Sequence, residues 1–567
     1  MTSTADKIAT LWPEIVLLMG AVSCLVTGLH RSSTARRWTP AVAAISLAVA
    51  LVLSLALDPG GQAMGFDGLT TWVRVLGYGL GLALLGVSVG LPDRVESHAM
   101  EPALGADDTG FNPARSVKGE YYAFFLFSLS GLGMVAAAGD LVWLFLALEL
   151  VSLPTYVMIA TARPTARSHE AAIKYFFLGA LSVAVFLYGF ALLYGATGFT
   201  DLEAIRLSVV GTGPTPLMLA GLALAVVGLC YKTACFPMHG YAADVYEGAP
   251  TAVTAFLAVV PKVAGFVALV LVLGTVGWPL PVPLVVLLSV IAIVTMTLGN
   301  VLALVQTKLK RVMAYSSVAH SGYLMLGLIA GPAVVGGVLG GETLLNPTRG
   351  DDGILSVAGA GNGLAGLLFY LLSYALATIT AIAIIGLLRT PGDADADPAS
   401  EAAESSPGYA DLQGLRHRHP VLGLALLLSM LSLMGVPPLI GFVGKLVLAL
   451  PVLELGLWPL VVALVLNSAI SAVYYLRIAV AGLGGGARRS DEAGAADAGP
   501  LAYAPFRGGV AIAGAVAVLV GGTFPAAWAF GSADRAFDTR ARAQPAASAA
   551  AGAPVAVEPA GRGEAGL

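Results

Sequence analysis

The stretch Gly228–Phe266 has the sequence GLCYKTACFPMHGYAADVYEGAPTAVTAFLAVVPKVAGF, and the rest of the chain is best understood from it. It contains two apolar helical segments, each with a lysine where a membrane would have hydrocarbon, Lys232 and Lys262. A lysine at the bilayer centre costs about 2.5–3.5 kcal/mol on insertion scales, so it usually faces a partner group or a water-filled path. Pro237 breaks the first helix, which a membrane tolerates only where protein or water satisfies the freed backbone groups. Two buried bases beside a broken helix therefore indicate a path for ions or protons.

The composition of the chain is that of a membrane protein. Of its 567 residues, 57% are hydrophobic and only 11% are charged, and the mean hydropathy is +0.84. Soluble domains do not have this balance, which is typical of polytopic helical membrane proteins. The first apolar stretch has no cleavage pattern of a signal peptide, so we expect it to be a membrane helix of the mature protein.

Windows of about twenty apolar residues predict fourteen membrane spans. They lie at approximately 12–29, 39–57, 71–91, 119–137, 140–161, 171–194, 216–237, 251–274, 282–305, 311–331, 363–388, 420–451, 456–482 and 508–530. The twelfth span contains Pro437 and Pro438 and is expected to form two half-helices, as is the seventh. We therefore expect an all-α polytopic membrane protein with two broken helices.

The basic residues of the loops predict the orientation of these spans. Residues such as Arg36, Lys310 and Arg488 follow odd-numbered spans, whereas the loops after even-numbered spans hold only Arg206 and Arg349 before the tail. The positive-inside rule then places the basic loops in the cytoplasm and both termini on the outer side of a bacterial cytoplasmic membrane.

Spans seven and twelve indicate an internal repeat, because both are broken by proline and both carry a lysine, Lys232 and Lys445. They lie five spans apart, and since five is odd, the repeats would be inverted across the membrane, as in many ion-coupled transporters. This predicts an N-terminal three-helix segment at 1–118, repeats at 119–274 and 275–482, a last helix within 483–533 and a disordered tail at 534–567. Two further loops, 331–362 and 390–414, are irregular in composition.

The sequence carries no motif for a redox cofactor. Cys24, Cys230 and Cys235 fall in apolar segments without metal-ligand spacing, so we expect them to be small core residues. No CxxC pair, P-loop or GxGxxG fingerprint is found in a strand–helix setting. Nucleotide, flavin or iron–sulfur chemistry is therefore expected on other chains.

Glu149 and Lys232 are expected to form a charge pair. Glu149 lies in the middle of LVWLFLALELVSLPTYV, where a lone carboxylate would be neutral, but a nearby ammonium would keep both groups charged. The alternative is a static structural ion pair, although buried pairs are poor stabilisers compared with apolar packing.

Lys262 is the best candidate for a central proton carrier, and Lys445 for a terminal one. No acidic residue shares the helix of Lys262, and the alternative is a lysine bound to the carbonyls that Pro261 frees. Lys445 comes seven residues after Pro438, so the end of a half-helix is near. A buried lysine can lose and regain a proton near neutral pH, which suits both roles.

The other polar candidates leave two interpretations open. His239 follows Lys232 by seven residues, which would place both on one helical face about 10 Å apart and favours a relay over a structural histidine. Ser316 and His320 share a helical face at i, i+4 and suit either a chain of water molecules or packing between helices.

Lys174 lies at the start of span six and either takes part in proton transfer or snorkels to the surface. Two further cations close to span ends stay unassigned, Arg74 and Arg477.

These motifs make the chain similar to the antiporter-like membrane subunits of bacterial proton-pumping NADH–quinone oxidoreductase, respiratory complex I, and most of all to the subunit N family. The segments that carry the resemblance are DLVWLFLALELVSLPT at 140–155, AAIKYFFLGALSVAVFLYGFALLYG at 171–195, DVYEGAPT at 244–251, KRVMAYSSVAHSGYLMLG at 310–327, DLQGLRHRHP at 411–420 and GVPPLIGFVGK at 435–445. It covers essentially all fourteen spans and excludes the tail and the two long loops.

The resemblance implies roles for these residues and partners for the chain. Glu149 and Lys232 would be the coupled pair of the family, Lys262 its central lysine and Lys445 its second-half lysine, and Lys174 and His320 also fall on motif positions. Quinone reduction elsewhere in the complex would move the pair and drive a proton across. NADH, FMN, iron–sulfur clusters and quinone would lie on other subunits, with no cofactor or metal on this chain. The implied partners are other membrane subunits, the peripheral redox arm indirectly and lipid, without nucleic acid.

The chain departs from the family pattern at one place. The segment before DVYEGAPT usually carries a Trp and a Pro, but here it is HGYAAD at 239–244. This departure predicts a less rigid loop beside the broken helix. All the main lysines are present, which is not expected of an inactive copy.

Two other functions compete with a proton-translocating subunit. The first is a subunit of a multisubunit Na⁺/H⁺ antiporter of the Mrp type, which resembles this family in its glutamate, lysines and broken helices. The exact residues of the motifs DVYEGAPT, KYFFLGA and GVPPLIGFVGK favour subunit N. The second is a membrane scaffold with structural lysines, which the cost of several charges inside the membrane argues against.

Overall fold

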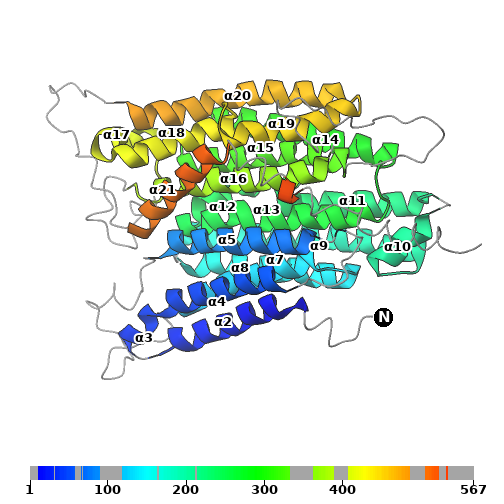
Figure 1. The fold of residues 1–567 in the computed structure, drawn as a ribbon, viewed down its shortest axis with the longest axis horizontal. Coiled ribbons are helices and arrows are strands. Elements are labelled where there is room, and N and C mark those ends of the chain that lie inside the picture. Colours follow the sequence, from blue (N-terminus) through cyan, green and yellow to red (C-terminus); the bar gives the residue numbers. More distant parts are fainter. Residues whose placement is uncertain are drawn as a thin grey trace, which may run out of the picture.

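The protein is a bundle of long helices that lie side by side (Figure 1). The computed structural model describes residues 10–30, 32–57, 66, 68–89, 118–162, 165–210, 213–332, 362–388, 406–484, 505–522 and 531–533. Within these ranges β structure is limited to two isolated bridges, between Asp140 and Asp201 and between Lys308 and Gly408. The predicted tail at 534–567 and most of the predicted loops at 331–362 and 390–414 lie outside the described residues.

In the described part of the chain, helices lie within the predicted spans, and residues 523–530 of the last predicted span lie outside it. The helices are α2 (Trp12–Gly28), α3 (Ser33–Arg37), α4 (Thr39–Ala56), α5 (Leu69–Ser88), α7 (Lys118–Ala136), α8 (Leu141–Ala162), α9 (Ala166–Thr197), α10 (Leu202–Val209), α11 (Pro216–Thr233), α12 (Ala242–Gly248), α13 (Thr251–Gly274), α14 (Val282–Leu304), α15 (Leu309–Ala330), α16 (Gly363–Ile385), the 3₁₀ turn η4 (Tyr409–Leu412), α17 (Leu415–Arg418), α18 (Pro420–Met434), α19 (Ile440–Glu454), α20 (Trp458–Leu483) and α21 (Pro505–Val520). In the described part of the chain, ten helices are long and apolar enough to cross a membrane, and α2, α18 and α21 are shorter apolar helices. The predicted class of all-helical membrane protein is confirmed.

The two predicted breaks are present. α11 ends at Thr233 because Ala234 adopts a left-handed conformation (φ 56°), and α18 ends at Met434 with a left-handed Gly435 (φ 91°). A left-handed residue stops the helical hydrogen-bond ladder and leaves the last carbonyls free for other donors. The seventh span therefore stops before Pro237, earlier than the sequence suggested.

The helix that carries Lys262 lies at the centre of the bundle. The most apolar part of α13 is completely buried, and α13 packs against α5, α7, α8, α11, α15 and α16. By contrast, only about a third of the most apolar part of α9 and of α20 is buried, so these helices face outward. The last helix, α21, runs obliquely over α16 and contacts α18 and α5 (Figure 1).

A glycine lets the helices of Lys232 and Lys262, α11 and α13, pack closely together. A Cβ atom on Gly265 would lie 2.8 Å from Cβ of Lys232 and 2.9 Å from Cγ2 of Thr233, which is closer than real side chains approach. The missing side chain therefore lets the end of α11 pack directly on α13, one turn after Lys262. This contact places both lysines in one buried region.

Candidate functional site

Lys232 and Glu149 form the predicted ion pair. Lys232 Nζ lies 3.1 Å from Oε1 of Glu149, and the Glu149 side chain is 17% exposed whereas Lys232 is 2% exposed. The ammonium also donates to the hydroxyl of Ser152 and, over 3.4 Å, to the carbonyl of Leu148. One stretch of α8 thus supplies a carboxylate and two neutral acceptors, which compensates much of the cost of burying the charge.

In the described part of the chain, Lys262 makes its hydrogen bonds to neutral groups only. Its Nζ donates to the carbonyl oxygen of Ser317 over 2.6 Å and to Oγ of the same serine over 2.6 Å. The ring of Tyr374 lies on a further side, with Nζ 4.5 Å from its centroid. The carbonyl that accepts from Lys262 belongs to Ser317 in α15. The alternative, in which the lysine binds carbonyls that Pro261 frees in its own helix, therefore does not match the geometry.

Lys445 uses the break of the twelfth span. Its Nζ donates to the carbonyl of Met434 over 2.9 Å and to Oγ of Ser468 over 3.2 Å, and it lies 4.9 Å from the centroid of the Tyr323 ring. Met434 is the last residue of α18, so this carbonyl is one that the break frees, at the negative end of the helix dipole. The half-helix therefore builds a site for a cation.

His320 lies between two tyrosine hydroxyls. Nδ1 is 2.7 Å from the Tyr370 hydroxyl and Nε2 is 2.8 Å from that of Tyr475. The hydroxyl of Tyr475 is also 2.5 Å from Oγ of Ser316, so the predicted shared face of Ser316 and His320 is confirmed by a common partner. A neutral imidazole donates from one nitrogen and accepts at the other, and tyrosine hydroxyls can satisfy both.

These groups form a row of polar side chains inside the bundle, in which backbone carbonyls supply some of the links. Oγ of Ser321 is 2.5 Å from the carbonyl of Thr233 and 3.1 Å from that of Ser317, which links the Lys232 region to Lys262. The Tyr374 ring contacts both Lys262 and His320, and Tyr323 contacts both His320 and Lys445. The polar row consists of Glu149, Lys232, Ser321, Ser317, Lys262, Tyr374, His320, Tyr323 and Lys445.

His239 lies apart from this row. The prediction that it shares a helical face with Lys232 is wrong, because α11 ends at Thr233 and His239 follows in the turn before α12. Its Nδ1 is buried without a hydrogen-bond partner in the described structure. In the same turn, the Tyr241 hydroxyl donates to the carbonyl of Tyr231 over 2.8 Å, and its ring packs on Tyr175, so a tyrosine anchors the segment that departs from the family pattern.

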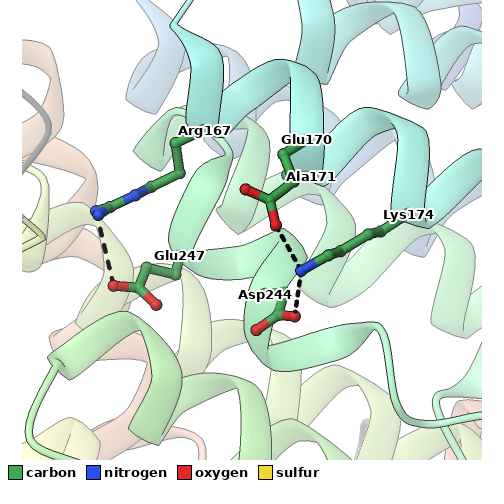
Figure 2. Close-up of a pocket in the computed structure, with 6 residues that line it drawn as sticks. All are labelled: Arg167, Glu170, Ala171, Lys174, Asp244 and Glu247. Carbon is green, nitrogen blue, oxygen red and sulfur yellow. Dashed lines mark hydrogen bonds and ion pairs between the residues drawn. The ribbon is translucent and has the colours of Figure 1, made fainter.

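Lys174 belongs to a charged network at the surface. Its Nζ is 2.7 Å from Oε1 of Glu170 and 2.9 Å from Oδ2 of Asp244, and its side chain is 45% exposed. Figure 2 shows both carboxylates reaching toward this ammonium across a cavity of about 130 Å³, which is lined by Arg167, Glu170, Ala171, Lys174, Asp244 and Glu247. The interpretation in which Lys174 reaches the surface is therefore the one that its exposure supports.

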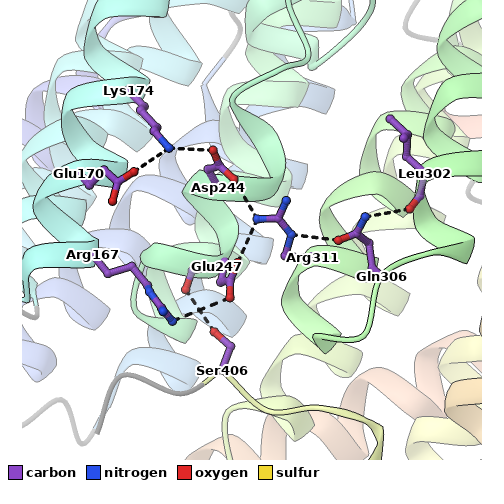
Figure 3. A network of polar contacts seen from close by, with 9 residues as sticks. All are labelled: Arg167, Glu170, Lys174, Asp244, Glu247, Leu302, Gln306, Arg311 and Ser406. Atoms are coloured by element: carbon purple, nitrogen blue, oxygen red, sulfur yellow. Dashed lines mark hydrogen bonds and ion pairs between the residues drawn. The ribbon is translucent and has the colours of Figure 1, made fainter. Parts of the chain in front are cut away.

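Arg311 ties this network to a third helix, α15. Its Nη1 lies 2.8 Å from Oδ1 of Asp244 and 3.0 Å from Oε2 of Glu247, and its Nε donates to Gln306 over 3.0 Å (Figure 3). Burial on its own would raise the pKa of Asp244, but the hydrogen bonds from Lys174 and Arg311 outweigh it and leave that pKa lowered. The network thus joins α9, α12 and α15 at one end of the bundle.

Sequence reasoning missed a second buried ion pair. Arg74 Nε donates to Oε1 of Glu14 over 2.7 Å and its Nη2 donates to Oε2 over 2.8 Å, while the Tyr78 hydroxyl donates to Oε1 over 2.8 Å. Glu14 lies in the first turn of α2, close to a span end, where a charge does not stand out in sequence. A search for a partner to the unassigned Arg74 would have found it. Arg477, the other unassigned cation, is exposed and donates to the carbonyl of Leu304.

Broken helices around a row of buried lysines define a class, that of polytopic membrane proteins with an ionisable path through the protein. The chain belongs to the family described as NADH:quinone oxidoreductase/Mrp antiporter, transmembrane, whose model matches residues 138–339 and 353–471. NADH-quinone oxidoreductase subunit N of Myxococcus xanthus is 38% identical over 493 residues, which cover 84% of this chain and 88% of the relative.

Solved structures share the fold. A chain of respiratory complex I from Thermus thermophilus is 28% identical with a TM-score of 0.65, and the match covers 91% of this chain and 97% of that one. A chain of the Mrp complex from Dietzia sp. DQ12-45-1b superimposes with a TM-score of 0.71 over 96% of this chain and 99% of that one, at 19% identity. At that identity the second match shows the fold alone.

Proposed function

We propose that this chain is the subunit N of an NADH–quinone oxidoreductase and moves protons across the bacterial cytoplasmic membrane. The observation that carries this proposal is the polar row, in which hydroxyls, backbone carbonyls and tyrosine rings link the buried lysines from Glu149 to Lys445. The subunit N relative covers most of the chain, whereas the Mrp chain supports the fold only, which makes an Mrp-type antiporter the less favoured alternative. The chain is thus a translocase subunit, with its redox chemistry on other subunits.

The proposed topology has fourteen spans. It counts as spans the ten long apolar helices, α7 and the short apolar helices α2 and α21, and it counts the pair α18 and α19 as one broken span. Two inverted five-helix repeats, at 119–274 and 275–482, would then each contribute one broken helix and its lysine. With both termini outside, the charged network of Arg167, Lys174 and Arg311 faces the cytoplasm.

The residues of the polar row take separate roles in this proposal. Glu149 and Lys232 sense the redox reaction through a change in their separation, because moving a countercharge changes the proton affinity of its neighbours. Lys262 carries the proton at the centre, His320 passes it on and Lys445 exchanges it at the far end. Outside the polar row, Lys174 and His239 take only an accessory role on the cytoplasmic side, where protons enter.

The partners follow from the same proposal. Other antiporter-like and small membrane subunits pack beside this chain, the peripheral redox arm acts on it indirectly, and lipid covers the outward faces of α9 and α20. NADH, FMN, iron–sulfur clusters and quinone bind elsewhere in the complex.

The test follows NADH-driven acidification and NADH oxidation in inverted membrane vesicles that contain the whole complex. Lys262→Ala is expected to abolish acidification attributable to this chain while the complex still assembles, as checked by co-purification of redox subunits. Unchanged acidification, with no redox subunit co-purifying, would instead favour the antiporter, and Na⁺/H⁺ exchange would then be assayed.

A further inference from the structure

A single residue, Ser317, supplies the hydrogen-bond acceptors of Lys262. Its carbonyl oxygen and its Oγ each lie 2.6 Å from Nζ, and the Tyr374 ring occupies a third side. An ammonium has three N–H donors, and these neighbours account for them without a carboxylate. The protonated lysine is therefore satisfied in a neutral site.

The hydroxyl of Ser317 has a hydrogen and two lone pairs to distribute. The Tyr374 hydroxyl donates to it over 2.8 Å, and the Tyr246 hydroxyl lies 3.3 Å away and can accept its hydrogen. When Lys262 is an ammonium, Oγ accepts from Nζ. When Lys262 is a neutral amine, Nζ gains a lone pair, and the same hydroxyl can turn and donate to it. A carboxylate could not do this, since it favours the charged lysine alone.

Ser321 connects this contact to the end of α11. Its hydroxyl has one hydrogen but two carbonyl acceptors, Thr233 at 2.5 Å and Ser317 at 3.1 Å. Thr233 is the last residue of α11 and follows Lys232 directly. A shift of this helix end would remove the nearer acceptor and turn the hydroxyl to the Ser317 carbonyl, where it competes with Lys262.

We propose that Ser317 is the positioning residue that holds Lys262 in both of its protonation states, and that Ser321 couples this contact to the helix end beside Lys232. The inference rests on the proposed function of Lys262. It adds a route by which movement at the Glu149–Lys232 pair reaches the central lysine through hydroxyls rather than through a direct charge contact.

The test measures NADH-driven acidification as a function of pH in vesicles that contain the whole complex with Ser317→Ala. The ammonium loses a charge-assisted bond, which is stronger than the neutral one that the amine loses. Proton transport is therefore expected to decline at lower pH than in the wild type, by about one pH unit, equivalent to about 1.4 kcal/mol. Ser317→Thr keeps a hydroxyl and is expected to restore the wild-type profile, which a purely structural role would not explain.

Two more variants separate the steps. Ser321→Ala keeps the direct contacts of Lys262, so a loss of protons moved per NADH oxidised is expected without a shift of the pH profile. Ser429→Ala removes another buried serine hydroxyl, bonded within α18 to the carbonyl of Ala425, and is expected to change neither property. Where Ser317→Ala does not assemble, Ser317→Cys replaces it, since a thiol keeps the volume but hydrogen-bonds weakly.

The outcomes distinguish this inference from the proposed function. If Lys262→Ala abolishes acidification while Ser317→Ala and Ser317→Cys keep the wild-type profile, the inference is wrong and the function stands. If Lys262→Ala itself pumps like the wild type, the function proposed for that lysine fails and the inference fails with it.

Discussion

Two lysines of the candidate site carry the same charge in different surroundings. Lys232 is buried against Glu149 and Ser152, whereas the side chain of Lys174 is 45% exposed beside Asp244. Removing one partner of a buried pair costs about 3–5 kcal/mol, while an exposed pair is worth at most about 1 kcal/mol. Burial therefore determines how strongly each charge is expected to affect transport.

Lys232→Ala and Glu149→Ala are each expected to lower NADH-driven acidification by about ten-fold or more, because a loss of only about 1.4 kcal/mol is enough. Lys174→Ala is expected to lower it by less than about two-fold, since water can solvate the carboxylates that remain. The double variant Glu149→Ala/Lys232→Ala should be no worse than either single one, because the pair acts as a unit. Full activity in both single variants would exclude a coupled role of Glu149 and Lys232 in transport.

At the scale of the helices, the sequence predicted the apolar elements and both breaks, because apolar runs and prolines are local signals. It placed the seventh break at Pro237, whereas the left-handed Ala234 ends α11 earlier, and the pairing of His239 with Lys232 was lost with that error. The serine that holds Lys262 could not be predicted either. A neutral side chain carries no local signal of which lysine it will meet once the helices pack.

A substitution at Gly435 tests whether the end of the half-helix α18 matters for transport or only for stability. Its φ is +91°, and a Cβ would lie 3.4 Å from Nζ of Lys445. Gly435→Ala is expected to cost about 1–2 kcal/mol of stability through backbone strain and to reduce acidification as well. Gly456→Ala is the matched control, because its φ is +74° but open space surrounds the position. Both should lower the melting temperature, and equal acidification in the two variants would contradict a role of this helix end in transport.

At the scale of the whole molecule, a buried ion pair joins α2 to the body of the bundle. Arg74 of α5 binds both carboxylate oxygens of Glu14 of α2, and Oγ of Ser130 in α7 lies 3.4 Å from the carbonyl of Glu14. α2 and α4 lie at one end of the row of helices, with α20 at the other (Figure 1). The pair is thus separate from the polar row and is expected to serve assembly rather than transport.

Glu14→Ala leaves Arg74 buried without its carboxylate, which is expected to destabilise the chain by about 3–5 kcal/mol. The yield of complex that co-purifies with this chain should fall, whereas the complex that does assemble should move as many protons per NADH as the wild type. Apolar side chains of similar volume often replace a buried pair without loss, so Glu14→Leu/Arg74→Met is expected to recover most of the yield. The measurements are the melting temperature of the purified complex and its ratio of protons to NADH. A lowered ratio in the double variant, with the yield restored, would mean that this pair takes part in proton transfer.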